Sequence, residues 1–345
     1  MDPLAAVTTE LFKKNRFVGH YTYVRPNEVV PHFFSRGSYY LSRRDKQLTG
    51  TVNSCLHRGY KLVTERTKLK PDQPITCKLH GWKYGHGGEL LTQPGFDHDI
   101  KQNCLGSVQF AEVKGGLFFE ADSVRSLTDL SKLLFEPVIA DIDLHDYQFD
   151  QENVAFYQVN WRTIMEIYLS SYNLENQHQG MGQYLKGEPS GRGGREYSLQ
   201  IHPINTQTYP AIPGIGWSKF YEEVRKVSWN KDWGAIFAAI FPGMMIEYFP
   251  HTIVINQLVP LSNKMTASYV QIFYDSLARE DYDFQNAFTE AYSEAAQETA
   301  YSQDILEDGR MGNHYDVLTL PTHTQLEAGI RTLNTWEEQN RPKWL

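Results

Sequence analysis

Two short stretches of the sequence, "CLHRG" at residues 55–59 and "CKLHGW" at residues 77–82, decide the fold. Each stretch pairs a cysteine with a histidine, which gives the set Cys55, His57, Cys77 and His80. Thiolate and imidazole ligands together suit iron or zinc. A Cys-x-His spacing is shorter than the usual zinc-finger knuckle, and it favours a tight loop whose two side chains face one cluster. The four residues are therefore predicted to bind metal.

The residues around the four ligands agree with this prediction. Gly59 and Gly81 permit the close approach of two loop backbones, and Trp82 is placed to shield a cluster from water. Two other interpretations use the same residues: a zinc site with these four ligands, or a chance grouping of Cys and His in a β-rich domain. Cys104 has no histidine at a comparable spacing, so we expect it to be a buried small hydrophobic residue.

Cys-x-His followed by Cys-x-x-His resembles the Rieske signature. In a Rieske [2Fe–2S] cluster two cysteines bind one iron and two histidines bind the other. The resemblance implies that Cys55, His57, Cys77 and His80 hold such a cluster. A Rieske domain transfers single electrons, so the rest of the chain must show whether those electrons are used.

Outward from the motif, the chain divides into two regions of different character. Residues 17–124 contain short β-type segments separated by Gly, Pro, Asp and Asn, which predicts a β-rich domain. Residues 125–345, together with 1–16, combine helical spacing around 157–174, several strand-like segments, and a long Ala/Glu/Gln-rich helix at 281–310. The overall fold class is therefore predicted to be α+β, with helices packed on an antiparallel sheet in the second domain.

Composition narrows the possible partners and compartment. The chain has 345 residues, a formal net charge of −8 and three cysteines. We expect no nucleic-acid partner, no membrane span, no signal peptide and a cytoplasmic location. The glycine-rich stretch 187–195 is expected to be a mobile loop, and it lacks the Lys-Ser/Thr ending of a phosphate-binding loop.

From about Phe17 to its end, the chain resembles the α subunit of Rieske non-haem iron ring-hydroxylating oxygenases. The Rieske motif carries the resemblance, with support from "NWRTIMEIYL", "FPGMMIEYFP" and the late helix. It implies a helix-grip-like antiparallel sheet in the second domain and a mononuclear Fe(II) held by two histidines and one carboxylate. It also implies a trimer in which an acid links this iron to the neighbouring subunit's cluster.

The family's iron-site motif corresponds to residues 160–178 and 298–308 of this chain. Asn160, Trp161, Glu166, Tyr168, Leu169 and His178 match the motif. The bridging acid falls on Ser170 and the first histidine on Asn173. The late-helix carboxylate falls on Gln303, with Leu306 three residues on, or on the adjacent Asp304. The tentative iron ligands are thus His178, Asp304 and Asn173, and Glu166, Glu175 and Gln177 are alternatives.

These departures leave two expectations for the iron site, a functional but unusual centre or a vestigial pocket. An asparagine oxygen binds Fe(II) more weakly than imidazole, and Ser170 cannot carry the charge of the bridging acid. The first predicted function is an oxygenase component that takes electrons from a reductase or ferredoxin and hydroxylates or demethylates a small organic, aromatic substrate. The alternative is a catalytically silent subunit that supplies its cluster to a catalytic α subunit in a hetero-oligomer, in place of a homotrimer. A ferredoxin-like carrier is a third hypothesis, but such carriers need no second domain of this size.

Overall fold

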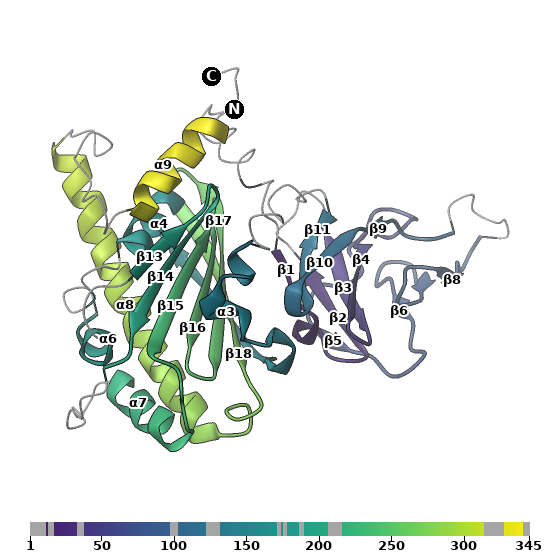
Figure 1. Ribbon diagram of the computed structural model, residues 1–345. Coiled ribbons are helices and arrows are strands. Elements are labelled where there is room, and N and C mark those ends of the chain that lie inside the picture. Colours follow the sequence, from purple (N-terminus) through teal and green to yellow (C-terminus); the bar gives the residue numbers. More distant parts are fainter. Residues whose placement is uncertain are drawn as a thin grey trace. The chain divides into compact units, whose positions relative to one another are not determined.

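The computed structural model (Figure 1) describes residues 12, 17–32, 38–96, 103–121, 132–170, 174, 178–185, 190–205, 216–313 and 328–340. Within these ranges only the backbone is described for residues 179, 301–313, 328 and 340. The chain forms two compact units. One unit comprises Arg16–Leu127, and the other comprises Met1–Asn15 with Thr128–Leu345.

The Arg16–Leu127 unit is built from short antiparallel strands in three sheets. The first sheet has the order β1 (Phe17–His20), β11 (Leu117–Glu120), β10 (Phe110–Val113). The second has the order β5 (Thr67–Lys68), β2 (Glu28–His32), β3 (Tyr39–Arg44), β4 (Gln47–Val52), β9 (Ser107–Val108). The third has the order β6 (Ile75–Thr76), β7 (Lys83–Tyr84), β8 (Leu90–Thr92). Two 3-10 turns, η1 (Tyr21–Tyr23) and η2 (Lys114–Gly116), complete the described elements.

The core of this unit positions the two Cys/His loops. The first loop follows β4, and the second is the turn between β6 and β7. Cys55 and Cys77 belong to the same buried cluster as Trp82 and Tyr84. Because these aromatic side chains are almost fully buried, they fix the base of each loop against the core.

The second unit contains a seven-stranded antiparallel sheet with helices packed on it. The strand order is β12 (Gln148–Tyr157), β18 (Met265–Tyr274), β17 (Thr252–Ser262), β16 (Met244–Phe249), β15 (Trp233–Ile240), β14 (Tyr197–Pro203), β13 (Ser190–Gly193). The described helical elements are α3 (Pro137–Ala140), η4 (Leu144–Asp146), α4 (Trp161–Leu169), α6 (Gln179–Tyr184), α7 (Gly216–Lys226), α8 (Tyr282–Asn313) and α9 (Ala328–Asn340). None of the described helices is long and apolar enough to cross a membrane.

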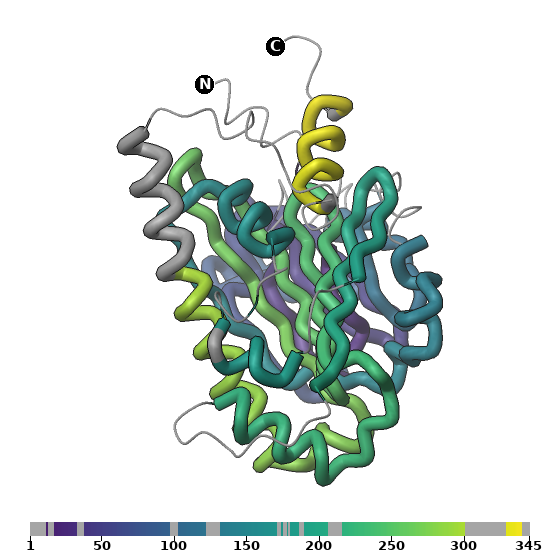
Figure 2. The backbone as a smooth tube through the Cα atoms, turned by 60° about the vertical axis from the view of Figure 1, so that its left-hand side comes forward, coloured from purple at the N-terminus to yellow at the C-terminus, as the bar shows by residue number. Residues whose placement is uncertain are grey.

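One face of the sheet carries the hydrophobic core of this unit. Side chains alternate between the two faces of a strand, so Ala235, Phe237 and Ala239 share one face, and Phe241 follows directly after the strand ends. The first two pack in a cluster with α7 and α8, and the last two pack in a cluster with α4 and α9. Figure 2 shows α8 running alongside the strands of the sheet. The helices therefore cover this face from both ends and enclose the space between them.

The structure confirms the α+β fold class and the long late helix. It differs from the sequence prediction in the glycine-rich stretch 187–195, where Ser190–Gly193 forms an edge strand. This strand is exposed and pairs with β14. Main-chain hydrogen bonds to one neighbour suffice for an edge strand, so side chains that fit a β pattern are not needed there.

Candidate active site

The two Cys/His loops close in the same way. In the first loop the Cys55 N–H donates to the Tyr60 carbonyl at 2.8 Å, and the Gly59 N–H donates to the Cys55 carbonyl at 2.8 Å. In the second loop Cys77 N–H donates to the Trp82 carbonyl at 2.8 Å, and Gly81 N–H donates to the Cys77 carbonyl at 3.0 Å. The matching bonds give both loops one backbone frame, although their Cys/His spacings differ by a residue.

Each loop contains one glycine whose backbone conformation requires that residue. Gly59 has φ 69° and Gly81 has φ 76°, both in the left-handed region that side chains disfavour. These are the two glycines that the sequence indicated. Each glycine turns the chain sharply just after the histidine of its loop, and this turn permits the loop to close.

The loops place the thiols inside and the imidazoles toward the surface. Cys55 and Cys77 are 3% and 2% exposed, whereas His80 is exposed and His57 half-buried. The rings of His57 and His80 lie 4.6 Å apart between centroids. The structure therefore brings a residue from each loop into direct contact, as the sequence motif requires.

Aromatic side chains surround this group. The Trp82 ring stacks on His57, with centroids 5.1 Å apart and planes at 10°, and Phe96 meets both rings edge-on at 5.2 Å. The Tyr84 hydroxyl lies 3.2 Å from the Cys55 sulfur and accepts the Leu56 N–H at 3.0 Å. Burial raises the pKa of Tyr84, so its hydroxyl keeps its proton as a donor to sulfur.

The chemistry of this donor set fits a [2Fe–2S] cluster. His57 Nδ1 is buried and has no hydrogen-bond partner among the described residues, as expected of a nitrogen that serves as a ligand. In the part of the chain that the structure describes, no group of three or more His, Cys, Asp or Glu side chains is arranged to hold a single metal ion. A [2Fe–2S] cluster needs no such group, since each iron takes only two protein ligands.

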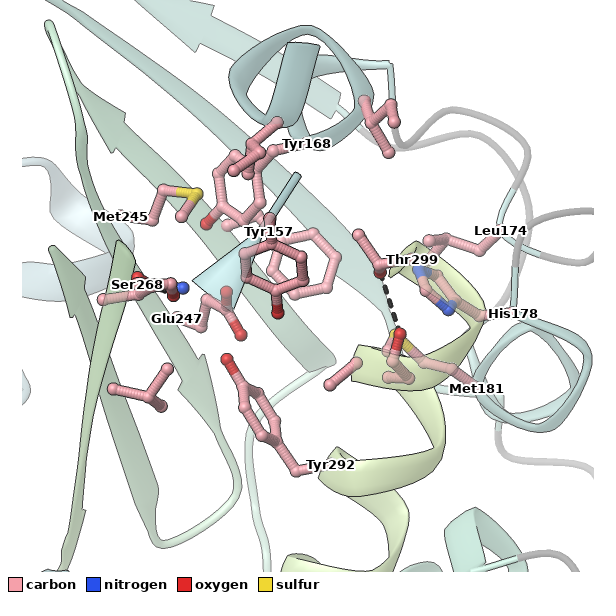
Figure 3. A pocket seen from close by; sticks show the side chains of 17 residues that line it. Tyr157, Tyr168, Leu174, His178, Met181, Met245, Glu247, Ser268, Tyr292 and Thr299 are labelled. Atoms are coloured by element: carbon pink, nitrogen blue, oxygen red, sulfur yellow. Dashed lines mark hydrogen bonds between the residues drawn. The ribbon is translucent and has the colours of Figure 1, made fainter. Parts of the chain in front are cut away.

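The second unit encloses a cavity of about 110 Å³ between the sheet and helices α4, α6 and α8 (Figure 3). On the same measure one water needs roughly 10–15 Å³, so the cavity can hold a small organic molecule. Its described lining is mostly apolar and aromatic, with a few polar side chains: Glu247, Asn256, Ser268, His178 and Thr299. Such a lining is typical of a small-molecule site.

His178 lines this cavity and is paired with a carboxylate. Its Nδ1 lies 2.9 Å from Glu298 Oε2, a residue of α8. Burial lowers the pKa of His178 and Glu298 partly opposes this effect, so the ring is neutral at pH 7. A carboxylate can only accept here, so Nδ1 carries the proton and Nε2 keeps a free lone pair. A carboxylate behind a histidine in this way is the usual support for a metal ligand.

Several other predicted site residues have structural roles or lie outside the described part. Ser170 ends α4, and its hydroxyl donates to the Glu166 carbonyl at 2.7 Å. The Glu166 carboxylate pairs with Arg162 at 2.9 Å. Asn173, Glu175 and Gln177 lie outside the described residues, as do the side chains of Gln303, Asp304 and Leu306. Of the predicted iron ligands, the structure thus describes the side chain of His178, together with its supporting carboxylate Glu298, which sequence reasoning did not identify.

The prediction for Cys104 was wrong, because this residue is exposed. It forms an isolated β-bridge with Glu89 near the surface, where its side chain is not packed in the core. It lies outside the two ligand loops, and cysteine content alone does not distinguish a surface thiol from a core one.

Glu247 is a second residue that sequence reasoning missed. It lies on β16, the central strand of the sheet, and is 7% exposed. Burial raises its pKa to about 7, and a hydrogen bond from Tyr292 partly offsets this effect. The available signal was a single acid within the apolar run "GAIFAAIFPGMMIEYFP".

Comparison with known proteins matches both units. The family model for the Rieske [2Fe–2S] domain matches residues 15–108, and that for the catalytic domain of the ring hydroxylating alpha subunit matches residues 141–339. The chain belongs to the Rieske non-haem iron oxygenase α-subunit family. This confirms the predicted family, the Rieske domain, and the type of catalytic domain that binds mononuclear iron in this family.

Two curated relatives are named putrescine 2-hydroxylase. The one from Bordetella bronchiseptica is 29% identical over 76% of this chain and 61% of the relative, so the match spans less than two thirds of that protein. The one from Ralstonia nicotianae is 28% identical over 82% of this chain and 77% of the relative. A solved quaternary ammonium Rieske monooxygenase shares the fold, with a TM-score of 0.75 at 16% identity, over 97% of this chain and 91% of that one.

Proposed function

We propose that this protein is the oxygenase component of a Rieske system, which oxidises a small organic substrate with O₂ in the cavity of the second unit. Electrons from a reductase or ferredoxin would enter through a [2Fe–2S] cluster on Cys55, His57, Cys77 and His80. The observation that supports this most is that His178, at the family's second iron-histidine position, lines the cavity. We assign the Rieske domain to residues 17–124 and the oxygenase-type domain to 125–345 with 1–16.

The residues available for iron are His178, through Nε2, and the tentative ligands Asp304 and Asn173. Fe(II) held there would supply the activation of O₂. The chain's own residues have separate tasks. Glu298 holds the proton on Nδ1 of His178 and fixes the ring, while the apolar wall that includes Leu174 and Met181 excludes water.

The substrate we propose is an organic cation, in place of the aromatic compound expected from composition. Relatives act on putrescine, and the structural neighbour is a quaternary ammonium monooxygenase studied for carnitine oxidation. These substrates carry ammonium groups at neutral pH. The reaction class proposed is hydroxylation or demethylation at a carbon atom of such a molecule.

Ser170 stands at the position where the family's bridging acid links the iron of one subunit to the cluster of its neighbour, so it concerns how the subunits assemble. The structurally similar monooxygenase transfers electrons between subunits. We propose an oligomer here too, a homotrimer in which each subunit is catalytic. The catalytically silent subunit receives no support from the relatives described above, which are named as hydroxylases.

Iron counting tests the proposal. We expect protein purified anaerobically to contain the two irons of the cluster plus a third, which gives a nitric oxide adduct visible by electron paramagnetic resonance. The matched variant His178→Ala should lose the third iron and keep the reduced Rieske signal. Two irons per chain in the unmodified protein, with no nitric oxide adduct, would contradict the proposal and favour the silent subunit.

A further inference from the structure

The cavity contains a buried carboxylate that has no positive partner among the described residues that line it. Glu247 lies on the face of β16 that points into the cavity, as does Met245 two residues before it. The described lining contains no lysine or arginine. An isolated buried charge is costly, so without a bound ligand the carboxylate is compensated by the hydrogen bond from Tyr292 and by uptake of a proton.

Three tyrosines surround this carboxylate, each from a different element. Tyr157 comes from β12, Tyr168 from α4 and Tyr292 from α8, and Figure 3 shows their side chains around Glu247. Burial raises the pKa of all three, and the charge of Glu247 raises it further. The tyrosines are therefore neutral, and they offer hydroxyl groups and aromatic rings but no positive charge.

Carboxylate and aromatic rings together are the chemistry that recognises an ammonium group. A cation is attracted to the negative face of an aromatic ring, and more strongly when water is excluded. A buried carboxylate adds a direct charge partner. A neutral aromatic substrate would give Glu247 no positive partner, and an anion would be repelled by its ionised form.

We propose that Glu247 and the rings of Tyr157, Tyr168 and Tyr292 form the subsite that binds the ammonium group of the substrate. This inference rests on the proposed function, because it names the residues that select the substrate in the same cavity. Figure 3 shows Glu247 beside the sheet and His178 across the cavity beside α8. A cation bound at Glu247 would therefore extend its carbon chain toward His178.

Binding to the oxidised protein without reductant tests the subsite apart from catalysis. Butylammonium and tetramethylammonium are the probes, and 1-butanol is the neutral match of the first. We expect Glu247→Gln to weaken binding of both cations at least tenfold and to leave butanol binding unchanged. Equal cation affinity in Glu247→Gln and unmodified protein would overturn the inference, as would an equal loss of butanol binding.

The matched control is Glu152→Gln. Glu152 lies on β12, on the sheet face opposite Tyr157, and its carboxylate accepts a hydrogen bond from Gln271 at 3.2 Å. This variant removes one carboxylate from the same sheet but none from the cavity. We expect it to bind the cations as the unmodified protein does, and a similar loss there would attribute the effect to net charge and overturn the assignment.

Proton release provides a measurement on the unmodified protein, in case Glu247→Gln fails to fold. A cation that binds the ionised carboxylate must displace the proton from the protonated fraction, so calorimetry at pH 6.5 in buffers of different ionisation enthalpy should show protons released. The other titratable groups of the described lining are the three tyrosines, which stay neutral, and His178. The His178→Ala variant removes any protons that His178 itself releases. Proton release that persists in this variant therefore supports Glu247 as the source, whereas the absence of proton release would overturn the subsite.

The two proposals fail in distinguishable ways. Cation binding by a protein that lacks the third iron would contradict the proposed oxygenase function and leave the subsite intact. A protein with the third iron and its nitric oxide adduct that binds neither cation would contradict the subsite and leave the oxygenase function intact.

Discussion

At the scale of single residues, Tyr84 joins the cluster loop to the core. Its hydroxyl contacts the Cys55 sulfur at 3.2 Å and also accepts the Leu56 N–H. A thiolate that binds iron can only accept, so the tyrosine must donate to it. Hydrogen bonds to cluster sulfur favour the more negative, reduced state and raise the reduction potential.

Tyr84→Phe should therefore lower the reduction potential of the cluster. One hydrogen bond of about 0.5–1.5 kcal/mol corresponds to roughly 20–60 mV for a one-electron couple. Redox titration followed by visible absorption would measure the shift. Tyr60→Phe is the control, because the Tyr60 side chain is exposed. An unchanged potential in Tyr84→Phe would exclude the hydrogen bond as a determinant.

Glu247 should make stability depend on pH. Its folded pKa of about 7 lies above the ordinary 4.5, so the folded state holds a proton that the unfolded state loses. The stability present below pH 4.5 therefore decreases as pH rises to 7, by at most about 3 kcal/mol. Urea unfolding across this range should show that Glu247→Gln removes the decrease. Glu290→Gln, on the exposed side of α8, should retain it.

The sequence could predict some of these residues and not others. The four cluster ligands stand in two short motifs, so local spacing was enough to find them. Glu298 and Glu247 have no motif, because their roles depend on contacts with residues 120 positions away or on burial in the centre of a sheet. Cys104 shows the same difficulty, because its exposure depends on the tertiary structure around it and not on a local motif.

At the scale of elements, α7 and α8 meet at a glycine. A Cβ on Gly216, the first residue of α7, would lie 2.7 Å from the Ala291 nitrogen and 2.9 Å from its Cα. These are backbone atoms of α8 and cannot move aside cheaply. The Gly216 N–H also donates to Glu294 Oε1 at 2.8 Å, which fixes the start of α7 against α8.

Gly216→Ala should destabilise the second unit by about 1–3 kcal/mol, since the two helices must separate to admit the methyl group. Chemical unfolding followed by circular dichroism would measure the change. Gly191→Ala is the matched control, because nothing lies within 4 Å of its Cβ position on the exposed strand β13. If Gly216→Ala lost no more stability than Gly191→Ala, the contact between α7 and α8 at Gly216 would not be tight.

Elements with a strong local signal were predictable. The long helix expected at 281–310 is α8, and its composition alone favours a helix. Helix α7 was not singled out, although its apolar residues Trp217, Phe220, Tyr221 and Val224 recur at helical spacing. Strand β13 was not predictable, because two of its four residues are glycine and its order comes from pairing with β14.

At the scale of the whole molecule, the division into two units predicts that the first unit can fold alone. Residues 16–127 contain all four proposed cluster ligands and their own buried core. Expressed separately, this fragment should be coloured and give a reduced Rieske signal. The same fragment with Cys77→Ser should be colourless, whereas Cys104→Ser should keep its colour. A colourless unmodified fragment would mean that the cluster requires the second unit.

Helix α8 contributes to both ends of the cavity, with Tyr292 near Glu247 and Glu298 behind His178. The two residues are six positions apart, so an unbroken helix separates them by about 9 Å along its axis. This rigid spacing would fix the distance between the bound ammonium group and the carbon atom that is oxidised. Among unbranched amines, the number of bonds between nitrogen and the oxidised carbon would then be set by helix geometry rather than by the chemical reactivity of each position.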